Sequence, residues 1–156
     1  MDYLKELYEI EKEYYINLPN VMREYRYKNI RCNSYIFEFI ADNIERICDF
    51  EKCEGDIGVY LIEDIYIGKS NRIRKRIAEH LEECLYDPSK FTSDKFYEFY
   101  IKSNNVEKVN RIREVLSKGK LKITLLSDDV KKEALMIREG YSLYDLTNRT
   151  SKPKTI

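Results

Sequence analysis

Apolar residues recur at helical spacing through the first third of the chain. Between residues 2 and 15, Tyr3, Leu7, Ile10 and Tyr14 fall on one side of a helix, which predicts an amphipathic helix. A second helix is predicted to begin at Ser34, a residue type that caps helix N-termini. Its apolar stripe consists of isoleucines: Ile36, Ile40, Ile44 and Ile47.

The pattern changes to that of strands after Gly55-Asp56. Residues 57–67 are rich in β-branched and aromatic types on both sides of Glu63-Asp64, which predicts a hairpin. An apolar stripe over residues 73–84 then predicts a helix, for which Ser70 or Asn71 is the expected N-cap.

The second half of the chain repeats this change of pattern. Residues 105–117 are predicted to be helical, and residues 121–126 are predicted to form a third strand. Asp128 or Asp129 is expected to cap a last helix. The apolar stripe of that helix is predicted to be Val130, Ala134 and Ile137.

These elements predict an α+β fold with a small three-stranded sheet, antiparallel or mixed, flanked by helices. We interpret residues 1–55 as an N-terminal helical extension. Residues 56–156 form the predicted sheet-containing domain, with a helical insertion around residues 86–118. A length of 156 residues suits one compact domain with a small appendage.

Composition excludes several classes of protein. With 43% hydrophobic and 36% charged residues, the chain is neither disordered nor fibrous. No apolar run approaches the roughly 18 residues of a membrane span, and the acidic N-terminus is unlike a signal peptide. We therefore expect a cytoplasmic protein. The four cysteines form no C-x-x-C pair, so we expect reduced thiols and no zinc site.

The net charge is zero, but the basic residues are clustered. Such patches can contact phosphates while the rest of the surface stays neutral. The first patch lies within eight residues and contains Lys69, Arg72, Arg74, Lys75 and Arg76. The second follows Asp145, contains no acidic residue, and consists of Arg149, Lys152 and Lys154.

Two short motifs make the pattern specific. Gly58-Val59-Tyr60 is followed by Tyr66-Ile67-Gly68, and Arg76 follows Tyr66 by ten residues. Glu133 lies on the predicted last helix, and Asn148 follows it by fifteen residues. Over residues 58–148 this set resembles the GIY-YIG nuclease family. The resemblance implies a metal-dependent endonuclease of restriction, phage, homing or repair type that hydrolyses phosphodiester bonds in DNA.

The resemblance assigns a role to each of these residues. Glu133 would bind Mg²⁺ or Mn²⁺, and one carboxylate suffices because Mg²⁺ keeps most of its waters. Arg76 would hold phosphate oxygens with its planar fork of donors. Asn148 would hold the backbone near the site by hydrogen bonds. The basic patches would contact flanking phosphates.

Two assignments are considered for the general base. Tyr60 is predicted to be the base, with His80, one helical turn after Arg76, accepting its proton. In the alternative, a hydroxide on the metal attacks and Tyr60 only orients it. His80, the single histidine, resembles a residue of some restriction enzymes in this family, although it could instead be structural. Tyr66 would position phosphate or water.

The hairpin is shorter than the family pattern. Only five residues separate Tyr60 from Tyr66, and the two can pair directly only across an odd-numbered loop such as residues 62–64. We expect a three-residue turn with a bulge.

Two questions stay open. A catalytically silent DNA-binding module would share the fold, and a double-strand cutter would have to form a homodimer or act twice.

Overall fold

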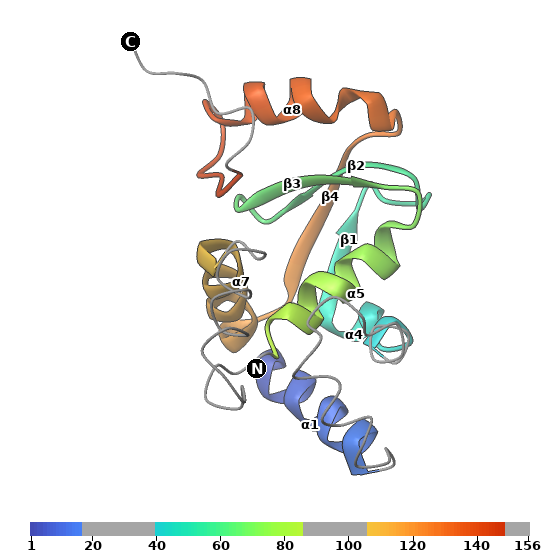
Figure 1. Ribbon diagram of the computed structural model, residues 1–156, viewed down its shortest axis with the longest axis vertical. Coiled ribbons are helices and arrows are strands. Elements are labelled where there is room, and N and C mark those ends of the chain that lie inside the picture. Colours follow the sequence, from blue (N-terminus) through green and yellow to red (C-terminus); the bar gives the residue numbers. More distant parts are fainter. Residues whose placement is uncertain (17–39, 86–105, 149–156) are drawn as a thin grey trace, which may run out of the picture.

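The computed structural model describes residues 1–16, 40–85 and 106–148. Within them, four strands form one mixed sheet in the order β1-β4-β2-β3 (Figure 1). Strand β2 is antiparallel to β3 and β4, whereas β1 is parallel to β4. The strands are β1 Cys48–Glu51, β2 Gly58–Ile62, β3 Tyr66–Ser70 and β4 Leu121–Ser127. The α+β class is thus confirmed, but the expected number of three strands is wrong.

The additional strand, β1, begins where helix α4 (Ile44–Ile47) ends. Cys48 is buried, Asp49 is exposed and Phe50 is half-buried, so the alternation of a strand is present over only four residues. A strand pattern of this length is too short to be recognised in the sequence, because it directly follows an isoleucine stripe of helical period. What makes β1 a strand is its pairing with β4, from Cys48 opposite Leu121 to Glu51 opposite Thr124.

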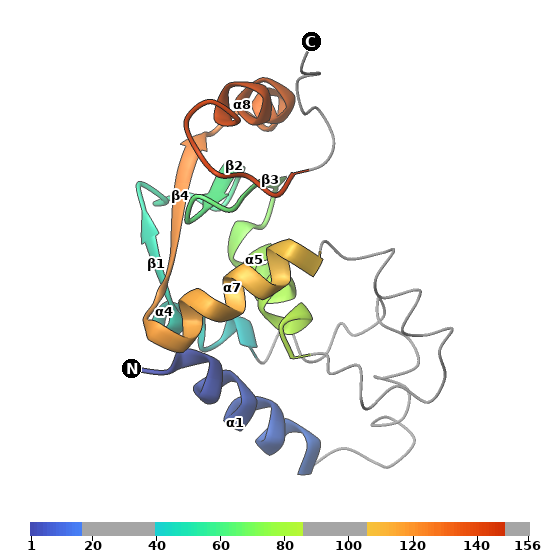
Figure 2. The ribbon, with the colours of Figure 1, turned by 90° about the vertical axis from the view of Figure 1, so that its left-hand side faces the viewer.

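The helices are divided between the two faces of the sheet (Figures 1 and 2). Helices α1, α4, α5 and α7 lie on one side of the β2–β3 hairpin, and α8 lies on the other. Their bounds are α1 Tyr3–Ile16, α5 Ile73–Glu83, α7 Val106–Lys118 and α8 Glu133–Gly140, the last preceded by the 3₁₀ turn η2 Val130–Lys132. None of the described helices combines the length and apolar character needed to cross a bilayer.

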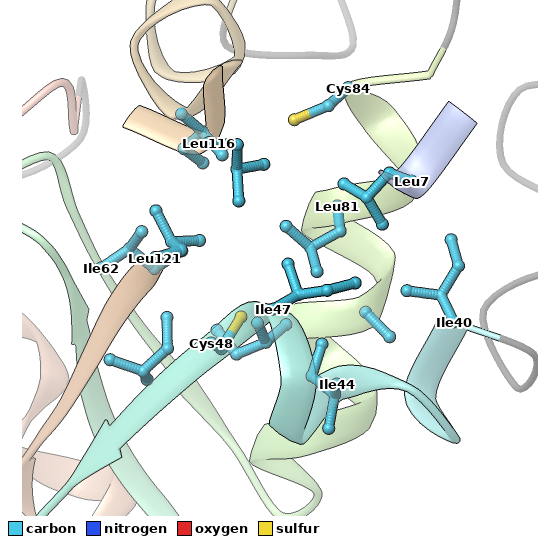
Figure 3. Packing of buried hydrophobic residues seen from close by; sticks show 14 of the residues in the cluster. Leu7, Ile40, Ile44, Ile47, Cys48, Ile62, Leu81, Cys84, Leu116 and Leu121 are labelled. Carbon is cyan, nitrogen blue, oxygen red and sulfur yellow. The ribbon is translucent and has the colours of Figure 1, made fainter. Parts of the chain in front are cut away.

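The larger core lies between the sheet and helices α1, α4, α5 and α7 (Figure 3). Leu7 of α1, Ile44 of α4, Leu81 of α5 and Leu116 of α7 meet there. Because Leu7 and Ile44 belong to this cluster, the predicted N-terminal extension packs into the same core as the sheet. On the opposite face, α8 packs Ile137 against a smaller cluster from β2 and β3: Val59, Leu61 and Ile67.

Several predicted segments lie outside the described residues. They include the beginning of the second predicted helix at Ser34, the part of the predicted insertion between residues 86 and 105, and the basic tail from residue 149. Of the insertion, the structure describes α7.

The β2–β3 hairpin has the predicted three-residue loop, but one residue later than expected. Ile62 pairs with Tyr66 and Tyr60 pairs with Gly68, which leaves Glu63 to Ile65 as the loop. The expected direct pairing of Tyr60 with Tyr66 is therefore wrong. A loop at residues 62–64 would remove Ile62 from the sheet, whereas Ile62 is fully buried. The bulge lies between β2 and β4, at Val59/Tyr60.

Candidate active site

The observed hairpin register places both motif tyrosines on the face that carries α5. Tyr60 and Ile62 lie two residues apart in β2, and Ile62 is opposite Tyr66, so all three share a face. Tyr60 is almost completely buried and Tyr66 is half-buried. The two phenols therefore reach the same side of the sheet although they are diagonal neighbours.

The two motif glycines make room for this arrangement. A Cβ at Gly68 would lie 2.4 Å from the Tyr60 hydroxyl oxygen and 2.6 Å from its Cζ, because the phenol ring lies over Gly68. Gly58 has φ +146°, and a Cβ there would lie 2.1 Å from the Ser127 carbonyl oxygen. Both positions thus require glycine for close backbone approach.

His80 on α5 lies directly against the two tyrosines. Its Nε2 is 2.8 Å from the Tyr60 hydroxyl oxygen, and its ring meets that of Tyr66 edge-on at 5.3 Å between centroids. The side chain is completely buried. Burial lowers the pKa of His80 well below its ordinary value, and the positive charges of Lys108 and Arg76 lower it further. The imidazole is therefore neutral at neutral pH.

Sequence reasoning missed Lys108, on helix α7. This lysine is 5% exposed, and its Nζ lies 3.0 Å from His80 Nδ1 and 3.1 Å from a carboxylate oxygen of Glu83. The same nitrogen lies 4.8 Å from the centre of the Tyr66 ring. One signal was available in the sequence, because Lys108 precedes Ile112 by four residues and so lies on the apolar side of its helix.

Arg76 supplies a partly exposed positive charge beside the tyrosines. Its Nη1 lies 2.5 Å from a carboxylate oxygen of Glu79, and about a third of the side chain is exposed, at 37%. Burial raises the pKa of Tyr60 and of Tyr66 above the ordinary value, and the charge of Arg76 opposes that rise in both. Both phenols are consequently protonated at neutral pH.

Glu133 is the first residue of α8, on the other side of the hairpin. Its negative charge adds to the rise in the pKa of Tyr60 and of Tyr66. Ala134 is exposed, so its predicted place in the apolar stripe is wrong. Instead, half-buried Glu133 shares a helix face with buried Ile137. The phase of α8 therefore turns Glu133 toward the sheet.

Asn148 fastens the outer edge of β3. Its Oδ1 accepts a hydrogen bond from Ile67 N at 2.9 Å, and its Nδ2 donates to Ile67 O at 2.8 Å. Thr147 N donates to Ile65 O at 2.7 Å. The buried amide thus replaces the backbone of a further strand next to Tyr66, in line with the expectation that Asn148 holds the backbone near the site.

Of the first basic patch, Arg74 is bound within the protein. Its guanidinium contacts Glu45 at 2.8 Å and the Cys53 carbonyl at 3.2 Å, and it stacks on the Phe50 ring at 4.5 Å. These contacts give Arg74 a structural role between α5 and the segment around β1. Lys69 and Arg72 are exposed, Lys75 is half-buried, and the second patch (Arg149, Lys152, Lys154) lies outside the described residues.

The N-terminus of α5 is capped differently from the expectation. Asp56 accepts a hydrogen bond from Arg74 N at 2.9 Å through its carboxylate and one from Ile73 N at 2.8 Å through its carbonyl. Ser70 accepts instead from Arg72 N. Asp56 could be identified only from the tertiary structure, because it precedes the hairpin and is distant in sequence from the helix.

The described cysteines, Cys48, Cys53 and Cys84, are buried and free. Burial raises the pKa of the Cys84 thiol to about 12, so it is protonated at neutral pH. Buried, protonated thiols of this kind act as packing groups.

Comparison of the chain with models of protein families, with curated proteins and with solved structures found no match.

Proposed function

We propose that this protein is a metal-dependent endonuclease of the GIY-YIG type that hydrolyses phosphodiester bonds in DNA. The observation that carries the proposal is the meeting of both motif tyrosines with His80 on the face of the hairpin that carries α5. The charges of Arg76 on α5 and Glu133 on α8 both act on Tyr60 and Tyr66 of the hairpin.

The chemistry of these groups suits an attack on a phosphodiester. A partly exposed guanidinium binds phosphate oxygens and stays charged as negative charge builds up on them. Two phenols can hold a phosphate oxygen or a water molecule by their hydroxyl groups. Such preorganised donors act where water is largely excluded, which strengthens their effect on the transition state.

Glu133 is a suitable metal ligand. A carboxylate oxygen is the donor that Mg²⁺ and Mn²⁺ prefer. In the described part of the chain, no three His, Cys, Asp or Glu side chains gather into a metal site. A cation at Glu133 would thus use one protein ligand together with water and substrate oxygens, as Mg²⁺ commonly does. When bound, it would polarise the phosphate and stabilise the leaving oxygen.

The buried environment of Tyr60 favours an orienting role for its hydroxyl over the role of general base. Because burial raises its pKa, Tyr60 is a neutral phenol at neutral pH. A phenolate base would first have to lose that proton at a large energetic cost. We therefore assign Tyr60 to orienting an oxygen of water or phosphate by its hydroxyl.

The decisive experiment is cleavage of supercoiled plasmid with Mg²⁺ or Mn²⁺ and with EDTA. We expect cleavage only with metal. Glu133→Gln should abolish it while DNA binding, measured without metal, is retained. Glu139→Gln is the matched control, because Glu139 is an exposed glutamate on the same helix.

A catalytically silent DNA-binding module is the alternative. Binding without cleavage by the wild-type chain under every metal condition would favour that alternative, and lack of both would exclude DNA as the ligand. Nicked products would indicate one cut at a time, whereas concerted linearisation would indicate a homodimer.

A further inference from the structure

His80 lies in a buried chain of polar groups from three elements. Tyr60 contacts one ring nitrogen, at 2.8 Å from Nε2, and Lys108 contacts the other, at 3.0 Å from Nδ1. His80 and Tyr60 are at most 1% exposed, and Lys108 is 5% exposed. Because the three side chains are buried, the donors and acceptors that they carry determine the direction of each hydrogen bond.

Lysine fixes that direction because a protonated ammonium has three donors and no acceptor. A carboxylate oxygen of Glu83 lies 3.1 Å from Lys108 Nζ, so the ammonium forms an ion pair within this buried chain. His80 Nδ1 must then accept, so it carries no hydrogen. In a neutral imidazole the single ring hydrogen then belongs to Nε2.

We propose that Lys108 is a positioning residue that holds His80 with its hydrogen on Nε2, so that His80 donates to the Tyr60 oxygen and the Tyr60 hydroxyl hydrogen points away from His80. This is the reverse of the relay expected from the sequence, in which His80 accepts the proton of Tyr60. The phenol can then donate its hydrogen to an oxygen bound beside Arg76.

Lys108 also touches Tyr66, with its Nζ 4.8 Å from the ring centre. One buried ammonium therefore orients Tyr60 through His80 and packs directly on the second motif tyrosine. For catalysis, this inference rests on the proposed nuclease function. The orientation of His80 itself does not depend on that function and can be measured separately.

Nitrogen NMR provides the first test, because His80 is the only histidine of the chain. In the full-length wild-type protein at pH 7.5, long-range ¹H–¹⁵N spectra should show a pyridine-type Nδ1 and a protonated Nε2. Lys108→Met, which removes the ammonium but retains the chain length, should shift the ring toward the other tautomer. A protonated Nδ1 in the wild type would overturn the proposal. So would a tautomer that Lys108→Met leaves unchanged.

Cleavage kinetics test the positioning role. Lys108→Met should lower kcat at least ~10-fold, as expected when a transition-state contact is misaligned, while the Kd for DNA stays unchanged because the lysine is buried. Lys118→Met is the control, since Lys118 lies on the same helix with a side chain 76% exposed. Unchanged kcat in an active, folded Lys108→Met would overturn the positioning role. If the wild type does not cleave DNA but shows the Nε2 tautomer, the nuclease proposal fails and the orientation of His80 stands.

If Lys108→Met does not fold, the wild-type spectrum still decides the tautomer, and Lys108→Arg provides the second variant. Arginine is also a cation with donors only, so the Nε2 tautomer should persist in it. Loss of that tautomer in a folded Lys108→Arg would contradict the proposal.

Discussion

The individual residues of the site are held in defined protonation states by burial. His80 is kept neutral because desolvation and two nearby positive charges oppose its protonation. Tyr60 and Tyr66 are kept neutral because burial outweighs the charge of Arg76. The charges of Arg76 and Glu133 act on both neutral phenols, and those of Lys108 and Arg76 act on the neutral imidazole.

The state of His80 leads to a pH dependence of stability. The pKa of His80 in the folded state lies well below 6.5, whereas in the unfolded chain it should lie near the ordinary value of 6.5. Below about pH 6.5 the unfolded state therefore binds more protons, and the free energy of unfolding should fall by up to about 1.4 kcal/mol per pH unit.

Urea unfolding at pH 7.5, 6.5 and 5.5 would measure this effect. His80→Gln, which is neutral throughout, should lose much less stability between the two lower pH values. Parallel loss in both proteins would show that carboxylates, and not His80, control this range.

Tyr60→Phe tests the role of the phenol. Since Tyr60 is assigned as a donor from a neutral hydroxyl, its removal should lower kcat by ~10²–10³, the scale for one preorganised donor, with the Kd for DNA unchanged. Single-turnover rates of both proteins between pH 7 and 9.5 give the measurement. A wild-type rate that rises about tenfold per pH unit, and a rise that Tyr60→Phe abolishes, would restore the general-base assignment.

At the scale of elements, the hairpin and its neighbours determine which side chains meet. The loop from Glu63 to Ile65 sets the register of β3 against β2. Asn148 then fastens the free edge of β3 through Ile67. The hydrogen bond between Arg74 N and Asp56 fixes the start of helix α5. This in turn fixes the position of His80 over the hairpin.

Gly68→Ala tests this close packing. The added methyl group would lie 2.4 Å from the Tyr60 hydroxyl, which must displace the ring and should destabilise the fold by about 1–3 kcal/mol. Thermal unfolding gives the measurement. Gly119→Ala is the matched control, because a Cβ there has no atom within 4 Å. Equal Tm shifts in the two variants would mean that the Tyr60 ring adapts at no cost.

At the scale of the whole molecule, the net charge is zero, and basic residues are clustered only locally along the sequence. Exposed Lys69 lies near the end of β3 and exposed Arg72 directly precedes α5, both close in sequence to Arg76. The sheet separates the helices of the α5 face from α8, with one core cluster on each face. DNA would therefore be bound by local contacts around the site and not by an overall positive surface.

Salt dependence tests this mode of binding. If about four phosphates are neutralised, the logarithm of the affinity should fall with the logarithm of salt concentration at a slope of about −3 to −4. Fluorescence anisotropy of labelled duplex DNA between about 50 and about 300 mM salt, over which the Debye length falls from about 14 to about 6 Å, gives the slope. Lys69→Ala and Arg72→Ala should each reduce its magnitude by about 0.9. A slope near zero would exclude phosphate contacts as the source of affinity.

The sequence by itself determined those features that depend on local period and spacing. The β-branched and aromatic residues on both sides of Glu63-Asp64 predicted the hairpin, and helical period predicted α1, α5 and the helix that follows β4. Motif spacing selected Tyr60, Tyr66 and Arg76 among many tyrosines and arginines. These features were accessible because strands and helices repeat every two and 3.6 residues, so that each residue's face follows from its neighbours.

Only the tertiary structure decided the contacts between distant segments. The pairing of Cys48 with Leu121 made a fourth strand, burial of Ile62 set the hairpin register, and Arg74 proved to be tied to Glu45. Above all, α7 brought Lys108 to His80 across 28 positions. Such contacts are selected by the joint burial of surfaces far apart in the chain. Local periodicity carries no information about which of those surfaces will meet.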